Sequence, residues 1–84
     1  MKGMAMEFDV DLDCTGLLCP LPVLRARKRL MAMRAGEVLR VLATDAMAAV
    51  DLPHFCAEAG HVFLAAEGTD AAMAYFIRCG SGRV

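Results

Sequence analysis

Residues 6–30, "MEFDVDLDCTGLLCPLPVLRARKRL", contain two hydrophobic periods in succession and predict a strand followed by a helix. Across residues 6–13, apolar and acidic residues alternate, as in a strand with one face on a core and the other in water. A helix is expected to open at Pro20. Its apolar stripe is Val23, Ala26, Leu30 and Met33, at spacings of three and four residues. Gly36 is expected to end this helix in the left-handed conformation.

A second strand and a second helix are expected to follow. Residues 37–43 predict a more buried strand, parallel to the first because a helix connects the two. Thr44 or Asp45 can cap the next turn, and Asp51 is expected to cap the second helix. This helix tolerates Pro53 near its start. Gly60 is expected to end it.

The last third of the chain predicts two more strands. Residues 61–67 and 71–79 form them, joined by a turn at 68–70. The order is β-α-β-α-β-β, and the acidic outer face of the first strand indicates that helices cover only one side of the sheet. The expected fold is therefore α/β, a two-layer open sandwich with a four-stranded mixed sheet and two helices on one face. Residues 1–84 are expected to form this single domain.

Composition limits the classes of protein that the chain can belong to. The chain has 84 residues, of which 58% are hydrophobic and 23% charged, so a globular domain is expected. Its net charge of −1 offers no overall field that would attract nucleic acid. The longest charge-free stretch, 14–24, is well short of the roughly 18 residues that suggest a spanning helix. No secretory signal is visible, so we expect a cytoplasmic protein with free thiols.

The stretch "TGLLCPLPVL", residues 15–24, places a cysteine directly before two prolines. Because proline disfavours helical geometry in the residue before it, Cys19 is expected to be the extended N-cap of the first helix. Pro20 and Pro22 remove two N–H groups, which leaves the amides of Cys19 and Leu21 free to face one anion. The helix dipole would then lower the pKa of the Cys19 thiol by between a few tenths of a pH unit and about 1.5 pH units. The larger thiolate fraction would make Cys19 a plausible nucleophile. On the residues alone, a small buried cysteine explains the stretch equally well.

Several segments together resemble the TusA/SirA-type sulfur carrier family. They are "LDCTGLLCPLPVLRARKRL", "GEVLRVLATD", "DLPHFC", "AGH" and "YFIR", in the order and spacing of that family. The Cys-Pro-x-Pro signature matches Cys19, Pro20, Leu21 and Pro22, and Gly16 lies in the loop before it. Two positions depart from the pattern. Leu18 stands where the family often has a basic residue, and Leu21 where some members have an acidic one, which makes the surroundings of the cysteine apolar.

The resemblance implies a βαβαββ fold and a sulfurtransferase that carries sulfane sulfur as a persulfide on Cys19. It implies a donor protein of the cysteine desulfurase or rhodanese type and an acceptor sulfurtransferase. The pathway would be tRNA thiolation, molybdenum cofactor assembly or sulfur oxidation. It implies no metal and no organic cofactor, no contact with membranes, and a monomer when the carrier is free.

The other cysteines have alternative interpretations. Cys14 could resolve a Cys19 persulfide by forming a disulfide, but strand alternation turns it towards the core, where free cysteine is common. Cys56 lies on the apolar stripe of the second helix, and Cys79 ends the last strand in a packed or partly exposed position. A zinc site would have to use residues without the usual short-spaced cysteine pairs, and we do not expect one. Its candidate ligands are Cys14, Cys19, His54, Cys56 and His61.

Charged residues near the cysteine are candidates for auxiliary roles. Asp45 matches an acidic position of the family and is also explained as a helix cap. His54 and His61 flank the second helix and are expected at the solvated surface. A basic face on the first helix is either solvated surface or a docking surface for partner proteins, with RNA disfavoured because no aromatic platform accompanies it. Its residues are Arg25, Lys28 and Arg29.

Two functional hypotheses follow from the sequence. The first is a persulfide carrier that relays sulfur through Cys19 between a donor and an acceptor protein. The second is a non-catalytic regulatory or interaction module in which the same thiol is structural or redox-sensitive. Replacement of Cys19 by Ser separates them, since it abolishes sulfur loading under the first hypothesis and leaves binding intact under the second.

Overall fold

The computed structural model describes residues 6–69 and 71–80, which form a sheet and two helices. The elements in chain order are β1 (Val10–Cys14), α1 (Leu21–Met31), β2 (Val38–Ala43), α2 (Ala48–Ala59), β3 (Val62–Thr69) and β4 (Ala72–Arg78). This order confirms the predicted βαβαββ arrangement. Asp70, in the turn predicted at 68–70, lies outside the described residues.

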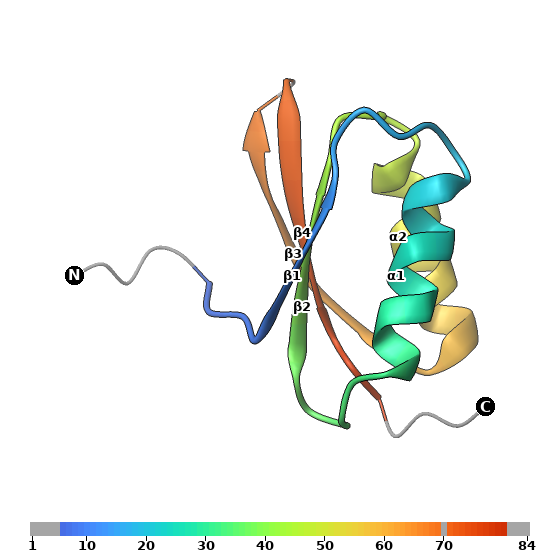
Figure 1. The fold of residues 1–84 in the computed structure, drawn as a ribbon, viewed down its shortest axis with the longest axis vertical. Coiled ribbons are helices and arrows are strands. Elements are labelled where there is room, and N and C mark those ends of the chain that lie inside the picture. The colour runs from blue at the N-terminus through green and yellow to red at the C-terminus, as the bar shows by residue number, and fades with distance from the viewer. Residues whose placement is uncertain (1–5, 70, 81–84) are drawn as a thin grey trace.

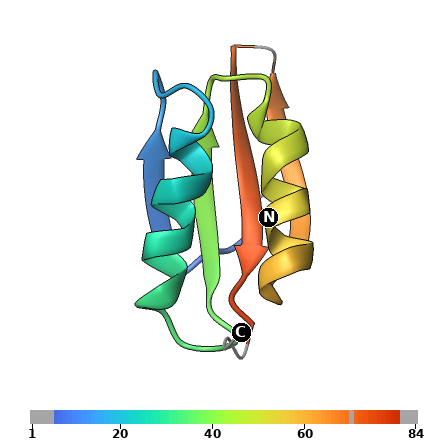
Figure 2. The same ribbon diagram turned by 90° about the vertical axis from the view of Figure 1, so that its right-hand side faces the viewer.

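The sheet is mixed, and its strands run in the order β1-β2-β4-β3. β1 and β2 are parallel, as predicted, and β4 pairs antiparallel with both β2 and β3. Both helices cover the same face of the sheet (Figures 1 and 2), and the opposite face is open. The two-layer sandwich expected from the sequence is therefore confirmed. Neither helix of the described residues is long and apolar enough to cross a membrane.

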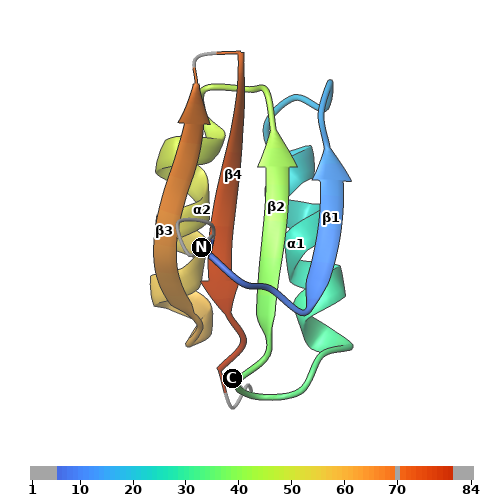
Figure 3. The same cartoon turned by 90° about the vertical axis from the view of Figure 1, so that its left-hand side faces the viewer.

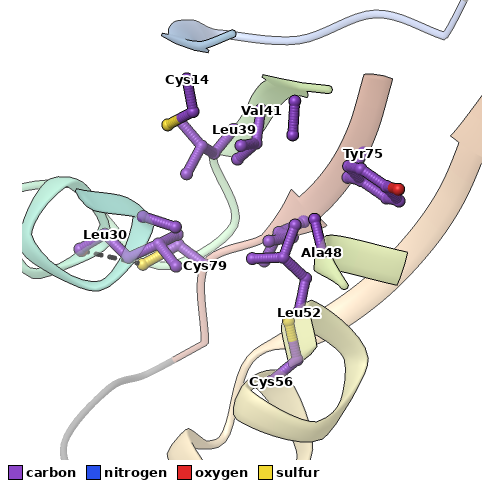
Figure 4. Close-up of a cluster of buried hydrophobic side chains, with 12 residues drawn as sticks. Cys14, Leu30, Leu39, Val41, Ala48, Leu52, Cys56, Tyr75 and Cys79 are labelled. Carbon is purple, nitrogen blue, oxygen red and sulfur yellow. Dashed lines mark hydrogen bonds between the residues drawn. The ribbon is translucent and has the colours of Figure 1, made fainter. Parts of the chain in front are cut away.

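The core lies between the helices and the sheet. Alternate residues of β2, Leu39, Val41 and Ala43, face the helices and are buried, as expected for a strand with one covered face. Figure 4 shows Leu39 and Val41 with Leu30 of α1 and Leu52 of α2, among the other members of the cluster. The predicted stripe of α1 is confirmed for Ala26 and Leu30, which are buried, and for Val23, which packs at the edge of the core. Met33 also packs against the core, but it lies beyond the end of the helix.

The first strand is shorter than predicted. β1 begins at Val10 rather than at Met6, because the chain bends at Asp9, whose N–H donates to the Val38 carbonyl. The bend places Phe8 on the open face, where its ring lies 6.4 Å from that of Phe76. Figure 3 shows this segment crossing the open face before β1. The prediction that Phe8 shares the core face was wrong, since alternation determines a face only while the strand stays straight.

The boundaries of α1 also differ from the prediction. Pro20 is the N-cap, and the Pro20 carbonyl accepts the first helical hydrogen bond, from the Leu24 N–H at 3.1 Å. Cys19 therefore lies one residue before the cap, outside the helix. At the other end the helix stops at Met31, so Gly36 is not its terminating residue. Gly36 instead adopts a φ of 95° in the following loop and donates its N–H to the Cys79 carbonyl.

α2 begins earlier than predicted, which changes the position of Asp51. The carboxylate of Asp45 accepts a hydrogen bond from the Met47 N–H, and the Asp45 carbonyl accepts one from the Ala48 N–H. This turn starts the helix at Ala48, so Asp51 lies inside the first turn and is not the cap. Pro53 lies inside the helix, where it supplies no N–H to the preceding turn. Gly60 ends α2 in the left-handed conformation, with a φ of 84°, as predicted.

We predict that Leu52→Ala lowers the free energy of unfolding by about 2–5 kcal/mol, because the fully buried Leu52 side chain would leave a cavity. Val50→Ala is the matched control on the same helix, since Val50 is 62% exposed. It should change stability by about 0.5 kcal/mol or less. Urea unfolding followed by circular dichroism measures both variants. Equal losses in the two would contradict the placement of Leu52 in the core.

Candidate functional site

The two parallel strands end at the same edge of the sheet, and the loops that follow them meet there (Figure 1). After β1, the chain turns at Gly16, which adopts a φ of 82°, a value that other residues rarely reach. The Gly16 N–H donates to the Thr44 hydroxyl at 2.9 Å. This contact joins the β1–α1 loop to the loop between β2 and α2. Gly16, which the sequence placed in the loop before the Cys-Pro-x-Pro signature, forms this turn.

Cys19 makes two hydrogen bonds to carboxylates of the second loop and helix. Its N–H donates to Asp45 Oδ2 at 2.6 Å. Its Sγ–H donates to Asp51 Oδ2 at 3.0 Å. The Cys19 side chain is exposed, whereas Asp45 and Asp51 are half-buried. The site therefore consists of one accessible sulfur between two acidic groups that belong to the opposite βα connection.

The predicted anion-binding helix start is absent from this arrangement. The Leu21 N–H donates to the Leu18 carbonyl at 2.8 Å, and the Cys19 N–H is bound to Asp45. Both amides that the sequence left available are therefore occupied. The prediction that they face an anion on the sulfur was wrong, because a turn at 18–21 and a distant carboxylate use them first. Pro20 is exposed and Pro22 buried, and neither supplies a donor.

The electrostatics of the site are the opposite of the expectation. The hydrogen bond to the Asp51 carboxylate raises the pKa of the Cys19 thiol, and reduced hydration and the charges of Asp51 and Asp45 act in the same direction. The N–H groups of Met47 and Cys19 lower the pKa of the Asp45 carboxyl, so that group stays ionised near the sulfur. The prediction of a lowered thiol pKa was wrong, because a directly bonded carboxylate outweighs a helix dipole.

The other three cysteines are enclosed. Cys14 is 0% exposed, Cys56 1% and Cys79 5%, so a reagent in solvent reaches Cys19 first. Burial raises the pKa of the Cys56 thiol to about 11. Burial also raises the pKa of Cys14, against an opposing effect of Arg25. The packing interpretation of Cys14 and Cys56 is confirmed, and a resolving role for Cys14 would require the loop to open.

The two histidines have partners other than the sulfur. His54 is exposed on α2 and pairs with Glu58 at 3.3 Å. His61, after the far end of α2, accepts a hydrogen bond from the Gly80 N–H at 2.9 Å through Nδ1. Half-burial lowers the pKa of His61. In residues 6–69 and 71–80, no three side chains of the usual metal-binding types gather closely enough to hold an ion.

The predicted basic face of α1 is exposed to solvent. Arg25, Lys28 and Arg29 are all accessible. Among the described residues, Arg40 pairs with Asp11 and His54 contacts Glu58, and neither interaction uses this face. The three cations are therefore free to meet a partner protein.

Large hydrophobic side chains are exposed in the Cys19 loop and at the helix starts beside it, and they form what we call the apolar rim. The rim consists of Leu18, Leu21, Leu24, Met47 and Val50. Leu18 is 69% exposed in the loop, and the others lie at the starts of α1 and α2. The sequence indicated Leu18 and Leu21 but missed Leu24, Met47 and Val50. Val50 could have been found, because it is a hydrophobic residue outside the buried stripe of its helix.

The sequence also missed the role of Asp51, which was predicted only as a cap. A topological signal was present. Asp45 and Asp51 both follow the second strand, and the carboxyl ends of neighbouring parallel strands meet at one edge of a sheet. That edge carries Cys19, so either carboxylate could have been placed beside its sulfur.

The fold and the site define a small two-layer α/β protein that exposes a single thiol at the junction of two βα connections. The sequence matches the family described as Sulfurtransferase TusA over residues 10–79. The chain therefore belongs to the TusA family, and it is a sulfur carrier of that family.

Individual relatives agree with this assignment. A protein of Neisseria meningitidis serogroup A is 56% identical over 59 residues, which cover 70% of this chain and 80% of the relative. The sulfur carrier protein TusA of Pseudomonas syringae is 37% identical over 73 residues, covering 87% of each chain. The crystal structure of the SirA-like protein from Desulfitobacterium hafniense has a TM-score of 0.68 at 27% identity, covering 86% of this chain and 99% of the other. The family resemblance seen in the sequence is confirmed.

We predict that Cys19 is the first cysteine alkylated in the folded protein, because the other three are buried. Sub-stoichiometric iodoacetamide followed by peptide mapping measures the distribution of label. Unfolding in urea is the control, and it should spread the label over all four cysteines. Preferential labelling of Cys14, Cys56 or Cys79 in the native protein would contradict the arrangement of the site.

Proposed function

We propose that Cys19 carries sulfane sulfur as a persulfide and relays it from a donor protein to an acceptor protein. The observation that supports this most directly is the exposure of the Cys19 sulfur in a chain whose other cysteines are buried. A carrier must present its sulfur to two proteins in turn, which requires an accessible atom. The membership of the TusA family adds independent support.

The chemistry of loading is a balanced exchange between sulfur atoms. The Cys19 thiolate attacks the outer sulfur of a donor persulfide, and a new S–S bond forms at Cys19 while the S–S bond of the donor breaks. The donor cysteine leaves as a thiolate and takes up the proton that the Cys19 thiol lost. Delivery to an acceptor cysteine repeats the same step in the other direction. No oxidant, metal or organic cofactor enters either step.

The two prolines have a natural role in such a carrier. Pro20 has no N–H and a restricted φ, and the buried Pro22 fixes the first turn of α1. Together with the Asp45 contact to the Cys19 N–H, they hold the backbone on both sides of the sulfur. A fixed backbone keeps the sulfur accessible while the partners change.

The alternative of a redox-sensitive regulatory thiol has less support. Redox-sensing cysteines combine exposure with a lowered pKa. The Asp51 carboxylate raises the pKa of Cys19 instead. The donor type, the acceptor, the pathway, a monomeric free state and a cytoplasmic location stay predictions.

We predict that the native protein gains the mass of one sulfur atom after incubation with inorganic polysulfide and removal of excess reagent. Cys19→Ser should gain none, because it lacks the accepting sulfur. Cys14→Ala is the matched control and should load like the wild type. Intact-mass spectrometry measures all three. Loading that persists in Cys19→Ser would refute the carrier function assigned to this residue.

The basic face of α1 is proposed as the docking surface for the donor and the acceptor. Arg25, Lys28 and Arg29 lie on the helix that starts directly after the Cys19 loop. Arg25 lies one residue after Leu24 of the apolar rim, whereas Lys28 and Arg29 lie in the last turn of α1, so a partner that covers both surfaces extends along the helix. Exposed cations raise association rates with acidic partner surfaces.

We predict that Arg25→Glu combined with Lys28→Glu slows transfer from a persulfide-loaded cysteine desulfurase by about tenfold or more, because charge reversal removes electrostatic steering. Loading from inorganic polysulfide should remain nearly unchanged, which controls for damage to the thiol. Arg27→Glu combined with Arg34→Glu makes the same change in net charge and serves as the matched control. An equal loss in both double variants would assign the effect to overall charge rather than to this face.

A further inference from the structure

The contact between Cys19 and Asp51 has a consequence for reactivity and for the choice of partner. A carboxylate 3.0 Å from the sulfur accepts the S–H proton, so it stabilises the thiol over the thiolate. The thiolate is the form that attacks a sulfur atom. The free protein therefore presents an accessible sulfur in its less reactive form.

The charges that act on this sulfur come from two elements, and both are negative. Asp51 belongs to α2, and Asp45 belongs to the loop between β2 and α2. Arg25, the first cation of α1, acts on the buried Cys14 and not on Cys19. Among the described residues, then, nothing of positive sign balances the two carboxylates at the sulfur.

We propose that Asp51 is a positioning residue that keeps the proton on the Cys19 sulfur in the free protein. When a partner docks, a cationic group of the partner takes the place of that proton beside the Asp51 carboxylate. The inference rests on the proposed carrier function and extends it to the chemistry of the partner. The matching donor or acceptor presents a Lys or Arg side chain next to its reactive sulfur. Asp45 strengthens the preference, because its charge acts on the same sulfur.

The proton and charge balance supports this sequence of events. When a partner cation pairs with Asp51, the carboxylate no longer stabilises the S–H bond, and the thiol proton leaves for the departing thiolate of the donor. The Cys19 sulfur then forms the new S–S bond as the donor S–S bond breaks. The cation also offsets the repulsion that the two carboxylates exert on an anionic sulfur.

The first test is the pH dependence of Cys19 alkylation by iodoacetamide in the native protein. Asp51→Asn should move the midpoint of the rate profile to lower pH, because it removes the charge that favours the thiol. When the midpoint falls by one pH unit, the thiolate fraction below it rises about tenfold and the nucleophilicity of the thiolate falls about threefold, so the rate rises about threefold. Asp51→Glu should restore a high midpoint.

Glu58→Gln is the matched control for this profile. It removes one carboxylate from the same helix, two turns further from the site, and should leave the midpoint unchanged. A midpoint that does not move in Asp51→Asn would overturn the proposal. An equal change of midpoint in Glu58→Gln would also overturn it, since the effect would then belong to net charge.

The second test measures the charge preference of the sulfur with three small disulfides: cystamine, which is cationic, hydroxyethyl disulfide, which is neutral, and dithiodipropionate, which is anionic. For each reagent, the rate with the wild type is divided by the rate with Asp51→Asn, measured at the same thiolate fraction. The intrinsic reactivity of the reagent cancels in this ratio. The wild type should favour the cationic reagent over the anionic one by about fivefold, and added salt should reduce this factor. Equal ratios for all three reagents would refute the selection of cationic partners.

These outcomes are distinguishable from a failure of the carrier function. Alkylation and disulfide exchange report on the Cys19 thiol whether or not it ever holds sulfane sulfur. If the protein took no sulfur from polysulfide but its midpoint fell in Asp51→Asn, the carrier function would be lost and the role of Asp51 kept. If the protein loaded sulfur normally but the midpoint stayed in place in Asp51→Asn, the carrier function would be kept and the role of Asp51 would be lost.

Discussion

The hydrogen bond from the Cys19 N–H to the Asp45 carboxylate fixes the position of the reactive sulfur. Residues 15–20 connect β1 to α1 and end in Pro20, which keeps Cys19 out of the helix and leaves the Cys19 N–H without a helical acceptor. The loop therefore depends on acceptors from elsewhere. Thr44 and Asp45 supply them from the loop after β2, because two parallel strands bring their ends together.

The same topology gives the molecule three kinds of surface that extend from the site along α1. Two carboxylates lie at the sulfur, the apolar rim lies at the starts of both helices, and the basic face continues to the last turn of α1. A partner that matches all three has a cation at its own sulfur, an apolar ring, and an acidic patch to one side. Because the three surfaces are arranged asymmetrically, they determine the orientation in which a partner docks as well as the affinity of docking.

The local signals in the sequence predicted the elements well, and the long-range contacts account for what they missed. Apolar spacing located both helices and all four strands along the chain, since it depends only on neighbours in the sequence. The pKa of Cys19 could not be predicted in this way, because it depends on Asp51, 32 residues further along the chain. By local rules Asp51 was predicted to cap α2, but the turn formed by Asp45 starts the helix four residues earlier, with Met47 at the cap position. Phe8 was misplaced for a similar reason, since Phe76 and Arg40 receive it on the open face.

An exposed thiol requires some protection from the many oxidants and electrophiles that a free carrier meets. Cys14, Cys56 and Cys79 are protected by burial, but burial would also block transfer to and from Cys19. A hydrogen-bonded carboxylate protects without enclosing, since it lowers the thiolate fraction and leaves the sulfur accessible. A positive charge on a docked partner can remove this protection by pairing with the carboxylate. Asp51 therefore makes it possible for the docked partner to activate the sulfur, whereas a helix dipole acting alone would leave it reactive in every encounter.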